Sequence, residues 1–263
     1  MIKSNQNKQQ MGTTMERHPI VVGISGPSRG GKTTLANNLT EFLPDPLFLL
    51  SQDNYFSINQ IIHQQQIKGI PWQNWEEPSA VDWHAFKSDI EEVVGKARAP
   101  VSQNELRKSA SLSYRHHHHH HHQLEGENSQ QQEQEEFKER PVVLIEGFLL
   151  FAEPVCWKFD KSVFVWADEP TTKWRRLHTT RVPEKYFDTF IWPEHVRYNH
   201  HLCQWEENQM LRERLGDDLL VVNGVKEDPK QMAKKVMDWI TGKVIIRDKA
   251  SELALLKSTL SLD

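Results

Sequence analysis

The 263-residue sequence predicts an α/β fold, in which a five-stranded parallel sheet has helices on both faces and a lid over one end. Three observations lead to this prediction. Short apolar runs alternate along the chain with longer amphipathic segments, the runs lack the alternation of half-exposed strands, and the first run leads directly into a glycine-rich loop. Strands without alternation are typical of parallel sheets, because both faces of such sheets are buried.

The glycine-rich loop extends from Gly26 to Thr34 and follows the first predicted strand, Ile20 to Ser25. Four residues separate its first glycine, Gly26, from a Gly-Lys-Thr triplet that contains Lys32 and Thr33, which is the spacing of a P-loop at a strand-to-helix junction. In such loops backbone N–H groups surround phosphate oxygens, the lysine reaches the β- and γ-phosphates, and the threonine hydroxyl reaches Mg²⁺. The expected nucleotide-binding residues are Gly26, Pro27, Ser28, Arg29, Gly30, Gly31, Lys32, Thr33 and Thr34.

The other elements follow from apolar runs and from apolar residues that recur at helical spacing. Further strands are expected at residues 47–50, 142–145, 161–166 and 219–222. Helices are expected at residues 35–43, 86–94, 171–181, 192–215 and 229–240. Residues 57–83 have no clear period, and a loop of that length with several aromatic residues is expected to be functional. Alternating strands and helices that begin with a P-loop predict the fold of P-loop nucleoside triphosphate hydrolases and kinases.

Changes in composition divide the chain into a main domain, residues 18–242, and three polar additions. Residues 1–17 are typical of a disordered arm, and residues 243–263 form a C-terminal tail. An insertion at about 97–140 contains the histidine run His116 to His122 and a stretch rich in Gln and Glu. We interpret it as a flexible surface segment that binds divalent metals only adventitiously, because a metal site needs fixed geometry. The run resembles a purification tag, but its internal position disfavours that origin.

The composition of the chain disfavours nucleic acids and membranes as binding partners. The net charge of −4 gives no basic surface for nucleic acid, and no apolar run is long enough to span a bilayer. The start of the chain lacks an apolar signal segment, and the only cysteines, Cys156 and Cys203, have no pairing or metal-ligand pattern. We therefore expect a cytoplasmic protein, with the nucleus as a second compartment, that acts on small molecules. The sequence does not indicate its oligomeric state.

Charged residues near the ends of the predicted strands indicate which chemistry the P-loop serves. Asp53 follows the second strand and is expected to accept the proton of an attacking hydroxyl. Glu146 follows four apolar residues, like the acid that holds the water shell of Mg²⁺ in P-loop proteins. Arg175, Arg176 and Arg181 are expected to close over the phosphates as a lid. The alternatives are a turn-capping aspartate, a surface glutamate and a solvated basic helix face.

Several motifs resemble the nicotinamide riboside kinases of the uridine kinase-like group. The resemblance extends from about residue 19 to residue 240 and is interrupted by the insertion. The P-loop is common to many proteins, whereas the other matching stretches are typical of this family. These stretches are Ser51–Phe56, Ile145–Phe151, Thr180–Val182, Tyr186–Asp188 and Trp192-Pro193.

The resemblance implies transfer of the γ-phosphoryl group of ATP to the 5′-hydroxyl of nicotinamide riboside, with nicotinic acid riboside as a further acceptor. The product is a mononucleotide for NAD biosynthesis. By the same resemblance Asp53 is the general base, Thr33 and Glu146 bind Mg²⁺, and Lys32 and Arg181 are catalytic. Arg181 and Pro183 are the nucleotide-binding residues of the lid segment. The segment from Asn223 to Asp228, with Lys226 and Asp228, is expected to lie beside the adenine.

The resemblance also implies an acceptor site, in which the sequence departs from the family pattern. Asp82 is expected to hold the ribose hydroxyls, and Tyr55 and Phe56 are expected to line that pocket. The family has tyrosines where this chain has Val81 and Pro183, and an arginine where it has His178. Those tyrosines enclose the pyridine ring in the family, so that another aromatic residue must replace them here. The candidates are Trp72, Trp75, Trp83 and Tyr186.

Other functions remain open at this stage. A uridine or cytidine kinase, or another small-alcohol kinase, would share the phosphoryl-transfer residues and differ in the acceptor pocket. A nucleotide-binding regulator without turnover would keep the P-loop, although the intact Lys32, Thr33, Asp53 and Glu146 disfavour it. A GTPase-type switch is disfavoured because no guanine-binding Asn-Lys-x-Asp stretch occurs.

Overall fold

The computed structural model describes residues 18–43, 47–57, 64–67, 69–99, 140–152, 158–203 and 218–242. The predicted arm at 1–17, the tail at 243–263 and most of the predicted insertion lie outside these ranges. Within them, no helix is both long and apolar enough to cross a membrane.

Five parallel strands form the central sheet, as the sequence predicts. They are β1 (Ile20–Ser25), β2 (Leu47–Ser51), β5 (Val142–Gly147), β6 (Lys161–Trp166) and β7 (Leu219–Asn223), in the spatial order β2-β5-β1-β6-β7. The central β1 is buried at every position, and so is its neighbour β5. The chain leaves β1 toward one edge of the sheet and later continues on the other side of β1. Ligands bind in α/β sheets at such a reversal, beyond the carboxyl ends of the strands.

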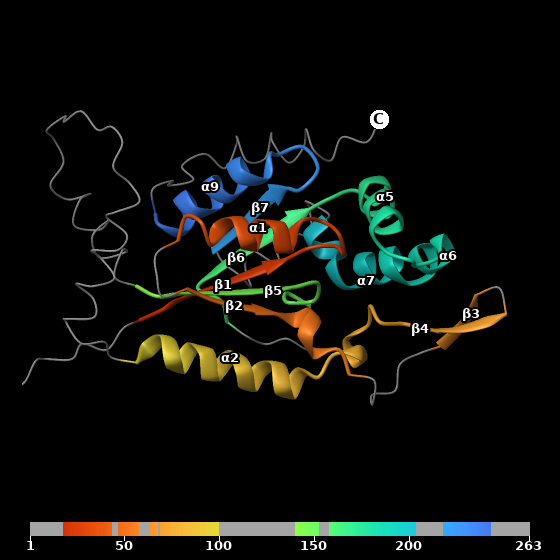
Figure 1. The fold of residues 1–263 in the computed structure, drawn as a ribbon, viewed down its shortest axis with the longest axis horizontal. Coiled ribbons are helices and arrows are strands. Elements are labelled where there is room, and N and C mark those ends of the chain that lie inside the picture. Colours follow the sequence, from red (N-terminus) through yellow and green to blue (C-terminus); the bar gives the residue numbers. More distant parts are fainter. Residues whose placement is uncertain are drawn as a thin grey trace, which may run out of the picture.

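Helices cover both faces of the sheet and enclose two separate cores (Figure 1). On one face α1 (Lys32–Leu39) and α9 (Pro229–Ile240) pack together, with Leu35, Leu39 and Val236 fully buried. On the other face α2 (Trp83–Arg98) buries Phe86 and Ile90 against the sheet. The strands are apolar on both sides because both sides carry a core. The predicted P-loop kinase fold is confirmed.

A helical arm beyond β6 differs from its predicted bounds. Helix α5 (Glu169–Thr179) begins where the Asp168 carboxylate accepts a hydrogen bond from Thr171 N at 2.8 Å. The next helix was expected to begin at Trp192, but helical structure begins earlier with α6 (Glu184–Tyr186), a π turn (Phe187–Ile191) and α7 (Trp192–Cys203). The π turn ends two residues before Pro193, which has no N–H to donate to the preceding helical turn.

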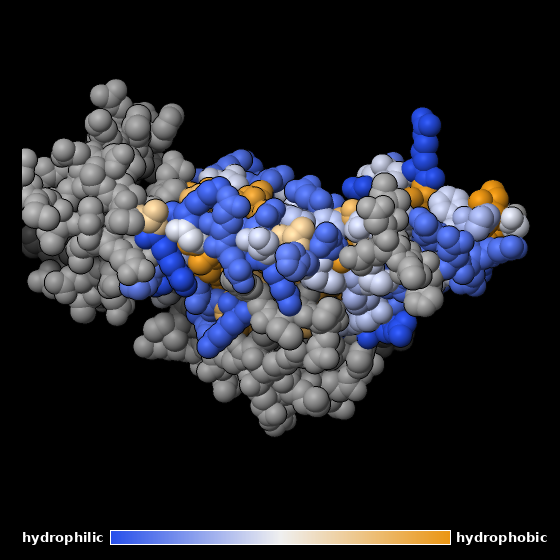
Figure 2. Space-filling view, turned by 90° about the horizontal axis from the view of Figure 1, so that it is seen from below, coloured by the Kyte–Doolittle hydropathy of each residue, from blue (hydrophilic) through white to orange (hydrophobic). Residues whose placement is uncertain are grey.

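Residues 57–83, for which the sequence shows no period, contain a hairpin that extends away from the sheet (Figure 1). Its strands are β3 (Gln64–Ile67) and β4 (Ile70–Gln73), joined by a turn in which Gly69 has φ +77°. Ile67 is buried among Tyr186, Phe187, Phe190 and Ile191 of the helical arm. Hydrophobic surface appears at the outer end of the hairpin, where Ile70 is exposed (Figure 2). The helical arm and the hairpin therefore hold each other beside the sheet.

Close packing at the end of β5 leads to a stability prediction. A Cβ on Gly147 would lie 2.7 Å from Gln52 Cβ. Gln52 is fully buried, and its Oε1 accepts hydrogen bonds from Phe148 N and Leu149 N at 2.9 and 3.2 Å. We expect Gly147→Ala to lower the free energy of unfolding by about 2 kcal/mol, because the overlap must be relieved within a packed core. Urea unfolding followed by tryptophan fluorescence measures the change.

Gly95 in α2 is the matched control. A Cβ at this position meets no atom within 4 Å. Gly95→Ala is expected to raise the free energy of unfolding by about 0.5–1 kcal/mol, because alanine loses less backbone entropy in a helix. Equal effects of the two substitutions would contradict the assignment of the Gly147 effect to packing.

Candidate active site

The P-loop connects β1 to α1 and leaves backbone donors available at the helix start. Gly26 has φ +149° and Gly31, at the N-cap of α1, has φ +112°, backbone values that other residues rarely adopt. No side chain caps α1, and its first turn contains no acidic residue. The N–H groups of the first turn are therefore directed at the space in front of the loop, which favours an anion there.

A cavity of about 750 Å³ lies in front of this loop. It is lined by the P-loop, by residues after β2 and β5, by the hairpin segment, by the helical arm and by the start of α9. Of the predicted site residues it brings together Ser28, Arg29, Gly31, Lys32, Thr33, Thr34, Asp53 and Phe56. Its other lining residues are Trp72, Trp75, Glu76, Phe148, Arg175, Arg176, Thr179, Val182, Tyr186, Gly224, Glu227, Pro229 and Met232.

Three carboxylates surround the amine of Lys32. Burial lowers the pKa of Lys32, and the charges of Asp53, Glu146 and Glu76 oppose that shift. Lys32 Nζ donates a hydrogen bond to Pro27 O at 2.9 Å, which holds the amine against its own loop. Asp53 lies in a 3₁₀ turn (Gln52–Tyr55) directly after β2, so that the sheet carries its carboxylate to the cavity edge. The buried Lys32 cation is therefore paired with carboxylates, and it can bind a more highly charged anion such as a triphosphate.

Thr33 and Glu146 meet where α1 begins and β5 ends. The Thr33 hydroxyl donates to Glu146 Oε1 and Oε2, at 3.1 and 2.9 Å. Hydroxyl and carboxylate oxygens are ligands that suit Mg²⁺, which keeps several waters and also binds substrate phosphates. Within the described residues no cluster of three or more His, Cys, Asp or Glu is suited to a metal. The pair fits an Mg²⁺ ion that is also bound by the phosphates of a nucleotide.

Arg175 and Arg176 join α5 to the P-loop. Arg175 Nη1 donates to Arg29 O and Gly30 O at 3.2 and 3.4 Å, and its Nη2 donates to Gly224 O at 2.9 Å. Arg176 Nη1 donates to Ser28 Oγ at 3.4 Å. Both arginines line the cavity, and their role in a lid stays a prediction. Arg181 is exposed after the end of α5 and is not a lining residue, so its lid role stays a prediction.

Glu76 is a site residue that the sequence analysis missed. Its side chain is buried and lines the cavity. Burial raises the pKa of Glu76 to about 7, with Asp53 and Glu194 adding to the shift while Arg176 and Lys32 oppose it. The segment around Glu76 lacks periodicity, so no sequence pattern favours this acid over its neighbour Glu77. The only available signal was its position directly after Trp75.

Aromatic side chains from the hairpin, from the helical arm and from the segments after β2 and β5 line another part of the cavity. Phe56 lies edge-on to Trp75, with ring centroids 6.0 Å apart, and stacks with Phe148 at 5.9 Å. Trp72 and Tyr186 are 5.4 Å apart. The Tyr186 hydroxyl donates to Gln73 O at 3.0 Å and accepts from Trp75 N at 3.3 Å, which fixes the hairpin against the helical arm. This half of the cavity suits a flat ring.

Other residues predicted to bind the acceptor have partners elsewhere. The Tyr55 hydroxyl donates to Asp89 Oδ2 at 2.6 Å, and its ring packs on Phe86. Asp82 Oδ1 accepts from Ala85 N at 2.9 Å and so caps α2. Val81 is fully buried. None of the predicted residues Tyr55, Val81, Asp82 and His178 is among the residues that line the cavity.

Two further predicted positions lie on the helical arm, and a third, at the start of α2, packs against the core beneath that helix. His178 is exposed and stacks on Trp174, with ring centroids 4.3 Å apart. Pro183 is the N-cap of α6. Trp83, which was one candidate to stack on the base, packs on Phe86 and donates to Pro78 O at 2.8 Å. Trp72, Trp75 and Tyr186 are the aromatic candidates that line the cavity.

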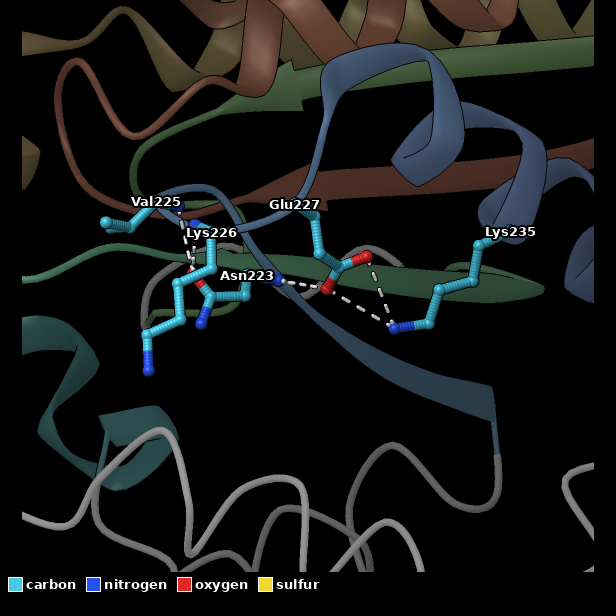
Figure 3. A network of polar contacts seen from close by, with 5 residues as sticks. All are labelled: Asn223, Val225, Lys226, Glu227 and Lys235. Carbon is cyan, nitrogen blue, oxygen red and sulfur yellow. Dashed lines mark hydrogen bonds and ion pairs between the residues drawn. The ribbon is translucent and has the colours of Figure 1, made fainter.

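The loop after β7 has its own polar network (Figure 3). Asn223 Oδ1 accepts from Val225 N and Lys226 N at 2.9 and 3.0 Å. Glu227 Oε1 accepts from Asn223 N at 2.8 Å and from Lys235 Nζ at 3.4 Å. These bonds keep the loop in one conformation beside the cavity, which Glu227 lines.

Close contacts with the P-loop and with β6 fix the position of the loop that follows β7. Gly224 packs so closely that a Cβ would lie 2.9 Å from Val165 Cγ1 and would overlap Gly30 O. Lys226 is exposed, and Asp228 Oδ1 caps α9 by accepting from Lys230 N and Gln231 N. Neither Lys226 nor Asp228 is a lining residue, and their nucleotide-binding roles stay predictions.

Comparison with known proteins gives consistent but distant relatives. No protein-family model matches the chain. The chain is 22% identical to human (Homo sapiens) nicotinamide riboside kinase 2 over 236 residues, which cover 88% of this chain and 85% of the relative. It is 28% identical to human nicotinamide riboside kinase 1, over 71% of this chain and 81% of the relative. The resemblance in the sequence motifs is thereby confirmed as distant homology to nicotinamide riboside kinases.

A solved structure of a possible uridine kinase from Bacillus stearothermophilus aligns with a TM-score of 0.39 and 15% identity. The alignment covers 79% of this chain and 90% of that structure.

The pKa of Glu76 predicts how stability depends on pH. A raised carboxyl pKa means that the folded chain retains a proton that the unfolded chain has released, so stability falls as the pH rises from 4.5 to about 7. Glu76→Gln removes the buried charge. We expect the melting temperature of the variant, relative to the unsubstituted protein, to be higher at pH 8 than at pH 5. Differential scanning calorimetry at both values measures the difference.

The exposed Glu91 of α2 provides the control. Glu91→Gln is expected to change the melting temperature by the same small amount at both pH values. A Glu76→Gln effect that did not depend on pH would contradict the assigned burial of the charge.

Proposed function

We propose that this distant homologue of the nicotinamide riboside kinases transfers the γ-phosphoryl group of ATP to the 5′-hydroxyl of nicotinamide riboside, and so contributes to NAD biosynthesis. One observation carries the proposal: a single cavity contains the P-loop with Lys32, the carboxylate of Asp53, and an aromatic compartment beyond it. The cavity thus offers hydrogen-bond donors and positive charge to a triphosphate, a carboxylate that can accept a proton, and aromatic surface to the ring of an acceptor alcohol.

The donor half binds the triphosphate. The N–H groups at the start of α1 and the Lys32 amine complement phosphate charge, and the loop after β7 lies beside the base. Thr33 and Glu146 would hold Mg²⁺, which when bound neutralises charge on the phosphate oxygens. Arg175 and Arg176 bring α5 onto the P-loop, so that the helical arm limits access of water to the phosphates.

Transfer needs an acceptor hydroxyl between the γ-phosphate and Asp53. The hydroxyl oxygen forms a bond to the γ-phosphorus, the bond from that phosphorus to the β-phosphate oxygen breaks, and ADP leaves with the electron pair. The hydroxyl proton moves to the Asp53 carboxylate, which acts as general base. Positioning of both substrates in one cavity supplies much of the rate increase.

We propose that Glu76, rather than Asp82, accepts hydrogen bonds from the sugar hydroxyls. Glu76 lines the cavity, whereas the Asp82 carboxylate caps α2. Where the family pattern has a tyrosine directly before the ribose-binding aspartate, Trp75 and Glu76 offer a different aromatic residue before a different acid. With Phe56, Trp72 and Tyr186, Trp75 would face the pyridinium ring, whose positive charge is attracted to aromatic faces and to the nearby carboxylates.

A nucleoside panel tests the proposal. With ATP and Mg²⁺, a coupled ADP-release assay is expected to give turnover with nicotinamide riboside, and nicotinic acid riboside is the second acceptor to compare. Both should exceed uridine and cytidine in kcat/KM. Absence of turnover with either pyridine nucleoside would refute the proposed substrate, and preference for a pyrimidine nucleoside would favour the uridine kinase alternative.

Variants of the three carboxylates separate their roles. We expect Asp53→Asn to lower kcat by at least about 100-fold, because the general base is lost. Glu76→Gln is expected to raise the KM for the nucleoside by about tenfold, because a charged hydrogen-bond acceptor is lost. Asp82→Asn keeps a good helix cap and should leave both constants within about threefold. Steady-state kinetics with a circular dichroism check of folding gives all three values.

A loss for Asp82→Asn as large as that for Glu76→Gln would instead support Asp82 as the sugar ligand. Undiminished transfer by Asp53→Asn would refute the assignment of the base.

A further inference from the structure

Arg29 occupies a strained position at the tip of the P-loop. Its φ is +62°, and it is the one non-glycine residue with positive φ in the part of the chain that the structure describes. The left-handed conformation is unfavourable for an ordinary residue, whereas glycine adopts it readily. Strained residues that persist in a loop cluster at sites of function, because the surrounding structure enforces them.

The backbone of Arg29 is held independently of its side chain. Arg29 O accepts a hydrogen bond from Arg175 Nη1 at 3.2 Å, and the neighbouring Gly30 N donates to Pro27 O at 2.9 Å. Within the described residues the guanidinium of Arg29 makes no hydrogen bond and no ion pair, and it lines the cavity. Its positive charge contributes to the lowered pKa of Lys32, so the two cations face a common space.

The other cations of the cavity already have protein partners, although the buried Nε of Arg176 has none. Lys32 donates to Pro27 O, Arg175 donates to three backbone carbonyls, and Arg176 donates to Ser28 Oγ and lies near Glu76. Arg29 is thus the cation of the described cavity whose five N–H donors have no protein partner. The Arg29 side chain is exposed at the cavity, and a planar guanidinium suits bidentate binding of phosphoryl oxygens.

We propose that Arg29 is a catalytic residue of the P-loop, whose guanidinium binds the γ-phosphoryl oxygens of ATP and stabilises the charge on that group during its transfer. This inference rests on the proposed function, in that the γ-phosphoryl group moves to an acceptor alcohol. During the step the oxygens of the transferred group remain bonded to phosphorus, the acceptor proton goes to Asp53, and ADP takes the electron pair of the broken bond. Arg29 donates hydrogen bonds throughout and exchanges no proton.

The experiment compares Arg29→Gly, Arg29→Asn and Arg29→Lys in the full-length chain. Glycine and asparagine both accept positive φ, so both variants should fold, and Arg29→Gly should melt at or above the temperature of the unsubstituted protein. We expect each to lower kcat by at least about 100-fold with the best acceptor of the nucleoside panel. Arg29→Lys should have an intermediate kcat, because lysine keeps the positive charge but lacks the two parallel N–H donors of the guanidinium. Added guanidinium ion should restore part of the activity of Arg29→Gly.

Measuring the affinities for ATP and ADP tests the role of Arg29 without any acceptor alcohol. In titrations with Mg²⁺, Arg29→Gly should weaken ATP binding by about tenfold relative to its effect on ADP, because ADP has no γ-phosphoryl group. Arg98→Ala removes an exposed arginine from the end of α2 and should change neither kcat nor this ratio.

The outcomes separate this inference from the proposed function. If no nucleoside is phosphorylated by the unsubstituted protein, the proposed function fails, and the ATP-to-ADP affinity ratio alone decides the role of Arg29. An unchanged ratio then overturns the inference. If turnover occurs, a kcat of Arg29→Gly within threefold of the unsubstituted value overturns the inference and leaves the proposed function intact.

Discussion

The parallel pairing of β1 with β5 is the constraint on which the candidate site depends. In this register Ser25 lies opposite Gly147, and β2 places Ser51 opposite Glu146. The strands therefore end at the same edge, and their hydrogen bonds bring together the loops that follow them. The contact between Thr33 and Glu146 is a consequence, because it joins residues that are 113 positions apart in the chain.

Close packing and charge then act together at this edge. The loops approach so closely that Gly147 and Gly224 have no room for a side chain. In the enclosed space Lys32 loses hydration, and the carboxylates of Asp53, Glu146 and Glu76 offset part of that loss. Opposite charges that are partly dehydrated and fixed in place form a preorganised environment, in which charge that develops on a phosphoryl group needs little rearrangement to be stabilised.

The sequence predicted the central sheet and the donor half of the site well, for physical reasons. Strands buried on both faces have continuous apolar runs, and a P-loop has a fixed spacing of glycines, so Ile20–Ser25 and Lys32 were identified directly. Asp53 and Glu146 were found because acids that follow short apolar runs are conspicuous. Their proximity in the structure agrees with the expected arrangement, while their chemical roles stay predictions.

The acceptor half was harder to predict, because residues 64–83 form a hairpin and turns without a core face of their own. The choice between Asp82 and Glu76 depends on which acid caps a helix and which acid lines the cavity, and the structure shows both. One sequence signal did exist: Asp82 stands directly before the amphipathic segment that becomes α2, which is a typical position for a capping aspartate. Glu76 has no such local signal, since its burial results from the hairpin and the helical arm meeting across the cavity.

The division between the two halves has a consequence for how such a protein can diversify. Trp72, Trp75 and Tyr186 belong to segments outside the central sheet, and they pack in one hydrophobic cluster that is separate from the two cores on the faces of the sheet. Substitutions among them alter the shape offered to an incoming alcohol while the strand registers and the P-loop remain intact. Related chains can therefore acquire new preferences for the group that receives the phosphate without rebuilding the machinery that delivers it.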